Sequence, residues 1–251
     1  MNPYLAEFIG TALLILFGNG VVANVVLPRT KGNAAGWIVI TAGWGFAVFV
    51  GAFCAAPYSG AHLNPAVTVA MAAAGKLELA KVPGYVAAQM FGAVVGATLV
   101  YFFYQKHFAA SNDADGKLAC FSTAPNIRGN AQALFCEVVG TFCLILPIFL
   151  IGSATITLPG AGGAAGTVET PIGLGAIGLV PVALLVFAIG LSLGGTTGYA
   201  INPARDLGPR IAHALLPIPG KRDSDWGYAW VPVVGPILGA ILAVVVYRGV
   251  S

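Results

Sequence analysis

The sequence predicts an all-α membrane protein with six transmembrane helices and two re-entrant half-helices. Three observations predict this class: 58% of the 251 residues are apolar, only 8% are charged, and the mean hydropathy is +0.87. A soluble domain carries about 25% charged residues, so this composition excludes a soluble enzyme. A net charge of +3 is too small for a surface that follows nucleic-acid phosphates, so we expect no nucleic-acid partner.

Long apolar runs, separated by polar or Gly/Pro-rich breaks, define the six spans. They lie near residues 4–27, 36–57, 82–105, 131–152, 174–196 and 228–248. Each run is long enough to cross a hydrocarbon layer about 30 Å thick. The first has no Lys or Arg before it and is longer than the core of a signal peptide, so we expect it to remain as a span.

Two further apolar stretches, 65–74 and 203–216, are too short to cross the bilayer. Each follows an Asn and begins with Pro, and these residue types favour the N-cap and the first position of a helix. Non-helical backbone before such a start is tolerated in a membrane only where it is buried in protein or lines a cavity. We therefore predict two half-helices that begin at the motifs Asn64, Pro65, Ala66 and Asn202, Pro203, Ala204.

Two connecting segments stand out. Residues 106–130 form the longest polar loop, and residues 158–173 are rich in Gly, Ala and Thr and are expected to be a flexible connection. Of the four cysteines, three lie inside apolar runs, so we expect small buried side chains and neither a disulfide nor a metal framework.

An internal repeat organises the chain as one domain, 1–251, built from two halves at about 1–125 and 130–251. The motif Glu-Phe-Ile-Gly-Thr at 7–11 recurs as Glu-Val-Val-Gly-Thr at 137–141, residues 60–66 recur at 198–204, and Gly-Tyr at 84–85 recurs at 227–228. Each half holds three spans. Since three is odd, the second half enters from the opposite face, and the repeat is inverted.

The two half-helices are then expected to meet near the midplane with both positive dipole ends pointing there. Cations, including a hydrated proton, meet a barrier at this place. The amides of Asn64 and Asn202 offer donors, and the carbonyls of the irregular segments offer acceptors. This arrangement suits a neutral solute that carries hydroxyl groups.

The paired Asn-Pro-Ala motifs, the run Ser-Gly-Ala-His-Leu-Asn-Pro-Ala-Val-Thr at 59–68 and the run Gly-Tyr-Ala-Ile-Asn-Pro-Ala-Arg-Asp at 198–206 resemble the major intrinsic protein (aquaporin) family over essentially the whole chain. The resemblance implies one pore per subunit, a homotetramer, no enzymatic activity and no cofactor. It also implies a multi-pass protein of a lipid bilayer, which we expect to be a bacterial cell membrane.

The resemblance implies a selectivity filter made of Trp44, Gly190, Tyr199 and Arg205. An arginine inside a membrane is functional by default, whereas an ion pair with the adjacent Asp206 is disfavoured because neighbouring helical side chains point to different faces. Two aromatic rings, one arginine and one glycine imply a wide opening with one apolar side. This combination resembles the glycerol-conducting branch of the family. Packing of Trp44 among helices is the alternative for that residue.

The remaining pore positions follow from the same resemblance. The backbone or side chains that line the pore are expected to be Gly60, Ala61, His62, Leu63, Gly198, Ala200 and Ile201. The carboxylates Glu7 and Glu137 lie inside apolar spans, and the resemblance gives them the structural role of bracing the irregular segments. Proton coupling is their alternative role, and pairing with backbone is the alternative for His62.

These features predict a passive channel for glycerol and similar small neutral solutes, with water and possibly urea as further solutes. The alternatives are a water-selective pore and, in a different class, a proton-coupled secondary transporter. His-Glu-x-x-His does not occur in the sequence. The one Gly-x-Ser-x-Gly, residues 190–194, lies inside an apolar span and not at a strand-to-helix turn, so no hydrolytic site supports an enzyme.

Charge alone opposes the family's orientation. With both termini inside, the outer face would carry eight cations against three, contrary to the positive-inside rule. The three inner cations are Lys76, Lys81 and Arg248, and the eight outer ones are Arg29, Lys31, Lys106, Lys117, Arg128, Arg210, Lys221 and Arg222.

Overall fold

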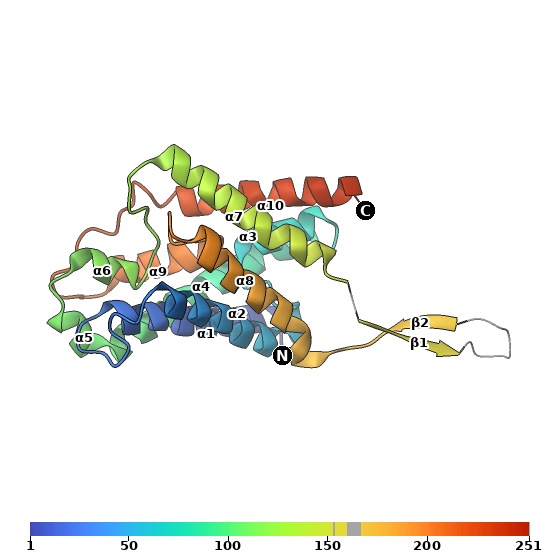
Figure 1. Cartoon of the computed structure of the whole chain (residues 1–251), viewed down its shortest axis with the longest axis horizontal. Coiled ribbons are helices and arrows are strands. Elements are labelled where there is room, and N and C mark those ends of the chain that lie inside the picture. The colour runs from blue at the N-terminus through green and yellow to red at the C-terminus, as the bar shows by residue number, and fades with distance from the viewer. Residues whose placement is uncertain (153, 160–166, 251) are drawn as a thin grey trace.

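The computed structural model describes residues 1–152, 154–159 and 167–250, and within them it contains the six predicted spans (Figure 1). Four are single helices: α1 (Pro3–Val26), α2 (Trp37–Ser59), α7 (Asn130–Leu150) and α10 (Val231–Val250). The other two begin with a short 3-10 turn and continue as α4 (Val82–Phe103) and α8 (Val180–Leu193), so the whole spans are Leu79–Phe103 and Gly175–Leu193. All six are long and apolar enough to cross a membrane.

The two half-helices are α3 (Pro65–Ala73) and α9 (Pro203–Leu215), which begin where the Asn-Pro-Ala motifs predict. Each half-helix packs against the third span of the other half as well: α9 lies against α4, and α3 lies against α10. The two halves therefore interlock, because each contributes a piece of the other's helix packing.

Glycines let the spans approach closely at equivalent places in the two halves. A Cβ on Gly92 of α4 would lie 2.4 Å from the carbonyl oxygen of Phe8 in α1. A Cβ on Gly239 of α10 would lie 2.3 Å from the carbonyl oxygen of Val138 in α7. Small residues at such contacts are typical of helix packing in bilayers, where close van der Waals contact replaces the hydrophobic effect.

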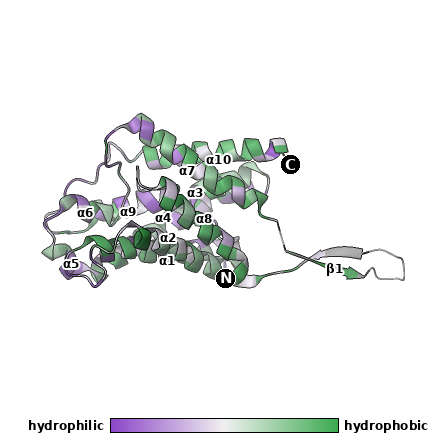
Figure 2. Ribbon diagram, viewed as in Figure 1, coloured by the Kyte–Doolittle hydropathy of each residue, from purple (hydrophilic) through white to green (hydrophobic). Residues whose placement is uncertain are grey.

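The hydropathy pattern fits a protein in lipid. Apolar residues cover the long helices, and polar residues gather on the loops and the helix ends (Figure 2). Large apolar side chains point outwards along the spans, for example Phe46 at 70% exposure, Phe91 at 68% and Phe135 at 66%. Such a surface is stable only against hydrocarbon or another apolar partner.

Two of our sequence predictions about loops need correction. The polar segment 106–130 contains two short helices, α5 (Gln105–Ala110) and α6 (Ala114–Ala119). The segment 158–173 falls partly on residues 160–166, which lie outside the described residues; its described parts belong to β1 (Thr155–Pro159) and β2 (Thr167–Pro171), paired antiparallel with Thr157 opposite Glu169. Threonine, valine and isoleucine favour strands, and this preference outweighs the Gly and Ala content from which we predicted a flexible connection.

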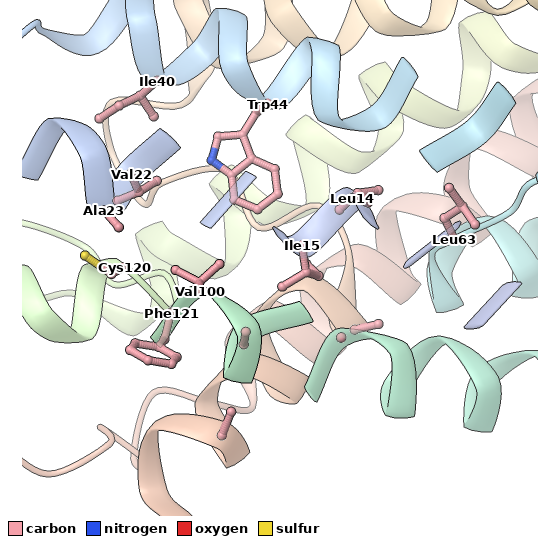
Figure 3. Packing of buried hydrophobic residues seen from close by; sticks show 14 of the residues in the cluster. Leu14, Ile15, Val22, Ala23, Ile40, Trp44, Leu63, Val100, Cys120 and Phe121 are labelled. Carbon is pink, nitrogen blue, oxygen red and sulfur yellow. The ribbon is translucent and has the colours of Figure 1, made fainter. Parts of the chain in front are cut away.

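The termini and the short helices α5 and α6 lie at opposite ends of the molecule. In Figure 1 the N-terminus, the C-terminus and the β1–β2 pair lie towards one end, and α5 and α6 lie at the other. We call the end with α5 and α6 the loop face. Cys120 belongs to this face and is fully buried next to Phe121 (Figure 3). Burial raises the pKa of its thiol, which keeps it protonated, and all four cysteines are free.

Candidate functional site: a pore between two half-helices

The two half-helices are capped and joined by the same pair of side chains. Oδ1 of Asn64 accepts from the backbone N–H of Ala66 at 2.8 Å, and Oδ1 of Asn202 accepts from the N–H of Ala204 at 2.9 Å. Nδ2 of Asn64 donates to the carbonyl of Ile201 at 2.9 Å. An amide NH₂ has two donors, so one N–H of Asn64 stays free of these bonds.

The backbone before each half-helix adopts the same unusual conformation. In the first segment Gly60, Ala61 and Leu63 have φ of 82°, 53° and 52°. In the second, the φ angles are 85°, 38° and 44° at the equivalent residues Gly198, Tyr199 and Ile201. Positive φ is uncommon for residues with a side chain and an outlier for a β-branched one, so surrounding contacts must hold it.

A buried carboxylate supplies those contacts in the first half. Glu7 in α1 accepts from the backbone N–H of His62 at 2.9 Å and of Leu63 at 2.7 Å, and from the hydroxyl of Ser59 at 2.6 Å. In a trans peptide the carbonyl points opposite to the N–H that follows it. With the N–H groups turned to Glu7, the carbonyls of Ala61 and His62 face away from it.

The second half repeats the arrangement with different residues. Glu137 in α7 accepts from the N–H of Ala200 at 3.0 Å, from the N–H of Ile201 at 2.8 Å and from the hydroxyl of Thr197 at 2.8 Å. Both carboxylates are fully buried. Because each is fully engaged with hydrogen-bond donors of the irregular segment, their geometry fits the bracing role.

His62 lies beside this network. Its Nδ1 is 3.2 Å from Oγ1 of Thr68, and its ring centroid is 5.0 Å from that of Tyr85. Gln89 connects the same groups, since its Nε2 donates to Glu7 at 2.8 Å and to Thr68 at 2.9 Å. The ring of His62 thus bonds to a side chain, and it lines the cavity described next.

Two cavities lie end to end along the half-helices. The inner one has a volume of about 240 Å³ and contains the meeting point of the half-helices; the outer one has about 160 Å³ and opens towards the loop face. The inner wall is mostly aliphatic, and its polar groups come from the two irregular segments, from Arg205 of α9 and from Trp44 of α2. The pore positions predicted from the sequence line the inner cavity at Gly60, Ala61, His62, Leu63, Asn64, Ala200, Ile201 and Asn202, and the outer one at Gly198.

Three residues line both cavities: Trp44, Tyr199 and Arg205. The guanidinium carbon of Arg205 lies 4.0 Å from the ring centroid of Trp44. The Trp44 ring reaches from α2 towards α1 in Figure 3, where a Cβ on Gly18 would come within 2.2 Å of it. A solute that moves from one cavity to the other must therefore pass between these three side chains.

Each of the three carries a buried polar atom without a hydrogen-bond partner among the described residues. These atoms are Nε1 of Trp44, Oη of Tyr199 and the NH1 nitrogen of Arg205. Buried polar atoms are nearly always paired, so these three, on residues that line both cavities, are candidate binding groups for a solute.

Gly190 differs from the expectation of a wide slot. A Cβ at this position would lie 2.9 Å from Cζ and from Oη of Tyr199, so the space beside Gly190 is taken by the tyrosine ring. Its carbonyl accepts from Nε1 of Trp37 at 3.0 Å, and the Trp37 ring meets the Tyr199 ring edge-on at 5.9 Å. The glycine therefore makes room for the ring instead of leaving an opening.

The sequence did not reveal a buried cluster behind the filter. Asp206 pairs with Arg210 at 2.8 Å, and both side chains are fully buried, so Asp206 does not pair with Arg205. Asp206 also accepts from the backbone N–H and the hydroxyl of Thr123, at 2.7 and 2.6 Å. The i, i+4 spacing of Asp206 and Arg210 was a usable signal for the pair, but nothing in the sequence pointed to Thr123.

Within the described residues, no cluster of His, Cys, Asp and Glu has the geometry to hold a metal ion. The acidic residues of the pore region are occupied by backbone and side-chain donors, as described for Glu7 and Glu137. The site is thus a passage with mostly apolar walls and a small number of hydrogen-bonding groups.

Comparison with known proteins places this geometry in a family. Residues 1–247 match the family model described as major intrinsic protein. The chain is 51% identical over 248 residues to a probable glycerol uptake facilitator protein of Thermotoga maritima, covering 99% of both chains. It is 51% identical over 247 residues to the glycerol uptake facilitator protein of Streptococcus pneumoniae, covering 98% of both. The X-ray structure of the aquaglyceroporin from Plasmodium falciparum superposes with a TM-score of 0.80 at 32% identity, covering 98% of this chain and 95% of that one.

Proposed function

Because this chain belongs to the major intrinsic protein family, we infer that it is a passive glycerol channel and a multi-pass protein of the cell membrane. One observation carries this function: Trp44, Tyr199 and Arg205 line both cavities, and each has a buried polar atom with no hydrogen-bond partner in the described part of the chain. A polyol needs several hydrogen-bond partners at once, and it finds them there.

The proposed path uses two kinds of wall. The carbon backbone of glycerol lies against the rings of Trp44 and Tyr199, and its hydroxyls bond to the NH1 nitrogen of Arg205 and to Nε1 of Trp44. In the inner cavity the carbonyls of the irregular segments accept from the hydroxyls, and the free amide N–H of Asn64 donates to them. Since each lost water is replaced by a protein partner, the desolvation cost stays low.

Ions are excluded by the same parts. The N-terminal ends of α3 and α9 meet in the inner cavity, and each carries about half a positive elementary charge. Arg205 adds a full positive charge one helical turn from Asn202. A cation would lose its hydration between these charges, so its barrier is high.

The finer properties are also part of the proposal. Water passes with glycerol, since it uses the same donors and acceptors, and urea fits the slot by its planar shape and several N–H groups. The channel works as a homotetramer with one pore per subunit, and the exposed apolar faces of the spans supply contacts to lipid or to neighbouring subunits. The filter and the two Asn-Pro-Ala motifs select the solute.

Reconstituted vesicles test the function directly. We expect stopped-flow light scattering to show glycerol flux far above that of empty vesicles, with the same rate whether or not a pH gradient is imposed. Water flux without glycerol flux would instead support a water-selective pore, and a rate that follows the pH gradient would support a secondary transporter.

A matched variant connects flux to the filter. Arg205→Val introduces the residue that Val67 supplies at the equivalent position of the first half. We expect it to lower the discrimination between glycerol and small ions, while Lys31→Met, a change at an exposed cation, leaves both fluxes unchanged. Equal discrimination in the Arg205→Val protein would contradict the filter assignment.

A further inference from the structure

The two half-helices end in different ways, although they begin alike. At the end of α3 the chain turns through Gly75, with φ of 76°, and the N–H of Lys76 returns to the carbonyl of Met71 at 2.8 Å. This closure satisfies the last carbonyls of α3 from the backbone itself. Arg248 of α10 also donates to the carbonyl of Ala73.

The half-helix α9 has no such closure. Its chain leaves in extended conformation at Leu216, and Pro217 follows, which has no N–H to donate. A helix end leaves several carbonyls without intrahelical donors. At α9 one side chain serves three of the last carbonyls: Nζ of Lys221 lies 2.6 Å from the carbonyl of His213, 2.8 Å from that of Ala214 and 2.8 Å from that of Leu216. The backbone N–H of Ile218 also donates to the carbonyl of Leu216 at 2.9 Å, and the carbonyls of His213 and Ala214 are bonded by Lys221.

The loop that carries Lys221 is itself fixed to the body. The hydroxyl of Tyr101 in α4 donates to the carbonyl of Pro217 at 3.0 Å, and Nζ of Lys117 in α6 donates to the carbonyl of Pro219. Lys221 therefore connects the end of α9 to a loop that α4 and α6 hold in place. A cation at this end also complements the negative end of the helix dipole.

Holding this end matters because of what the other end carries. Arg205 is in the first turns of α9, about 14 Å along the helix axis from Ala214. Pro209 lies between them and cannot donate to the carbonyl of Arg205, so one helical bond is missing at the turn that bears the filter residue. Because this turn lacks a bond, the helix beyond it needs its own anchors: Arg210 bonds to Asp206 and to the carbonyls of Thr123 and Ser224, and Lys221 holds the end.

We propose that Lys221 is a positioning residue of the filter: its ammonium group holds the C-terminal end of α9 and so fixes where Arg205 stands beside Trp44. The inference rests on the proposed glycerol function and extends it to a residue far from the pore. It also explains part of the excess of cations on the loop face. Lys117, Arg210 and Lys221 are bonded to carbonyls or to a buried carboxylate there, and so serve the fold.

The test compares three proteins in the same vesicles: wild type, Lys221→Met and Lys221→Arg. Methionine has nearly the length of lysine but neither its charge nor its hydrogen-bond donors. Arginine keeps the positive charge and the hydrogen-bond donors. We expect the ratio of glycerol to water permeability to fall by about threefold or more in Lys221→Met, as for coupled residues of one network. Lys221→Arg should restore most of the ratio.

Controls separate this role from simple stabilisation. Lys31→Met removes an exposed cation of the same face and should leave the ratio unchanged. If Lys221→Met does not assemble, Lys221→Gln retains an amide donor and is measured in its place. A variant that melts at lower temperature but keeps the wild-type ratio overturns the inference.

The outcome also distinguishes this inference from the proposed function. Absence of glycerol flux in the wild type would overturn the function and the inference together. Normal wild-type flux, with the ratio unchanged in Lys221→Met, would overturn the inference alone.

Discussion

Asn64 and Asn202 are linked by a reciprocal pair of hydrogen bonds across the centre of the molecule. Nδ2 of Asn64 donates to the carbonyl of Ile201 at 2.9 Å, and Nδ2 of Asn202 donates to the carbonyl of Leu63 at 2.8 Å. Each asparagine thus caps its own half-helix and holds the residue just before the other one. The two halves of the repeat are thus joined at the wall of the inner cavity.

This relationship predicts the effect of Asn202→Asp. Aspartate caps a helix as well as asparagine does, so α9 keeps its start, but the bond to Leu63 is lost because a carboxylate cannot donate. A negative charge also appears where cations are excluded. We expect glycerol flux to fall and sodium leak to rise, as measured by flux assays in vesicles. Normal glycerol flux through Asn202→Asp, in vesicles that stay impermeable to sodium, would contradict the role of the amide.

The filter predicts that Gly190→Ala is harmful. The new Cβ would lie 2.9 Å from the ring and the hydroxyl of Tyr199 and 2.9 Å from the methyl group of Thr41, so the ring of Tyr199, which lines both cavities, must shift. Overpacking of this kind costs about 1–3 kcal/mol, and we expect glycerol flux to fall about tenfold while water flux falls less. Gly227→Ala is the control, since a Cβ there has no neighbour within 4 Å and Gly227 is exposed and lines neither cavity. Equal effects of the two variants would show that the ring is free to move.

The bracing carboxylates predict a loss of stability in Glu137→Gln. The carboxylate accepts three hydrogen bonds, from Thr197, Ala200 and Ile201. A glutamine amide has one oxygen for them and would turn an NH₂ group towards donors. Bonds to a charged acceptor contribute about 1.5–3 kcal/mol each, so we expect a clear fall in melting temperature and loss of flux. Wild-type melting in detergent would argue against bracing.

The buried pair behind the filter is suited to a double-mutant cycle. Asp206 and Arg210 are both fully buried, and removal of one partner leaves an unpaired buried charge, which costs about 3–5 kcal/mol. We expect Arg210→Met and Asp206→Leu to lower the melting temperature strongly as single changes. The double variant should be less damaged than the sum of the two. Additive effects would mean that the residues act independently.

The loop face shows where sequence reasoning ended. Charge counting placed eight cations there and set them against the positive-inside rule. In the structure Arg210 and Lys117 are buried and bonded to acceptors, so they are part of the fold and are poor indicators of orientation. The positive-inside rule applies to exposed charges near the ends of spans, and the sequence alone does not show which charges are buried.

The sequence by itself determined the spans, the two half-helix starts and the repeat. Hydropathy over some twenty residues reflects transfer into hydrocarbon, and the Asn-Pro start depends on neighbouring residues alone, so both are local properties. Glu7 and Glu137 were recognisable because a carboxylate inside an apolar run needs partners.

Only the tertiary structure decided what those residues touch. That Tyr199 fills the space beside Gly190, that Asp206 reaches Thr123, and that Lys221 closes the end of α9 all depend on contacts between distant or irregular segments. Such contacts depend on how the helices pack and on how the loops fold. The hydropathy pattern of the sequence predicts the helices but does not specify how they pack against one another. The two cavities of the proposed path are formed at that level, since residues of both halves line them.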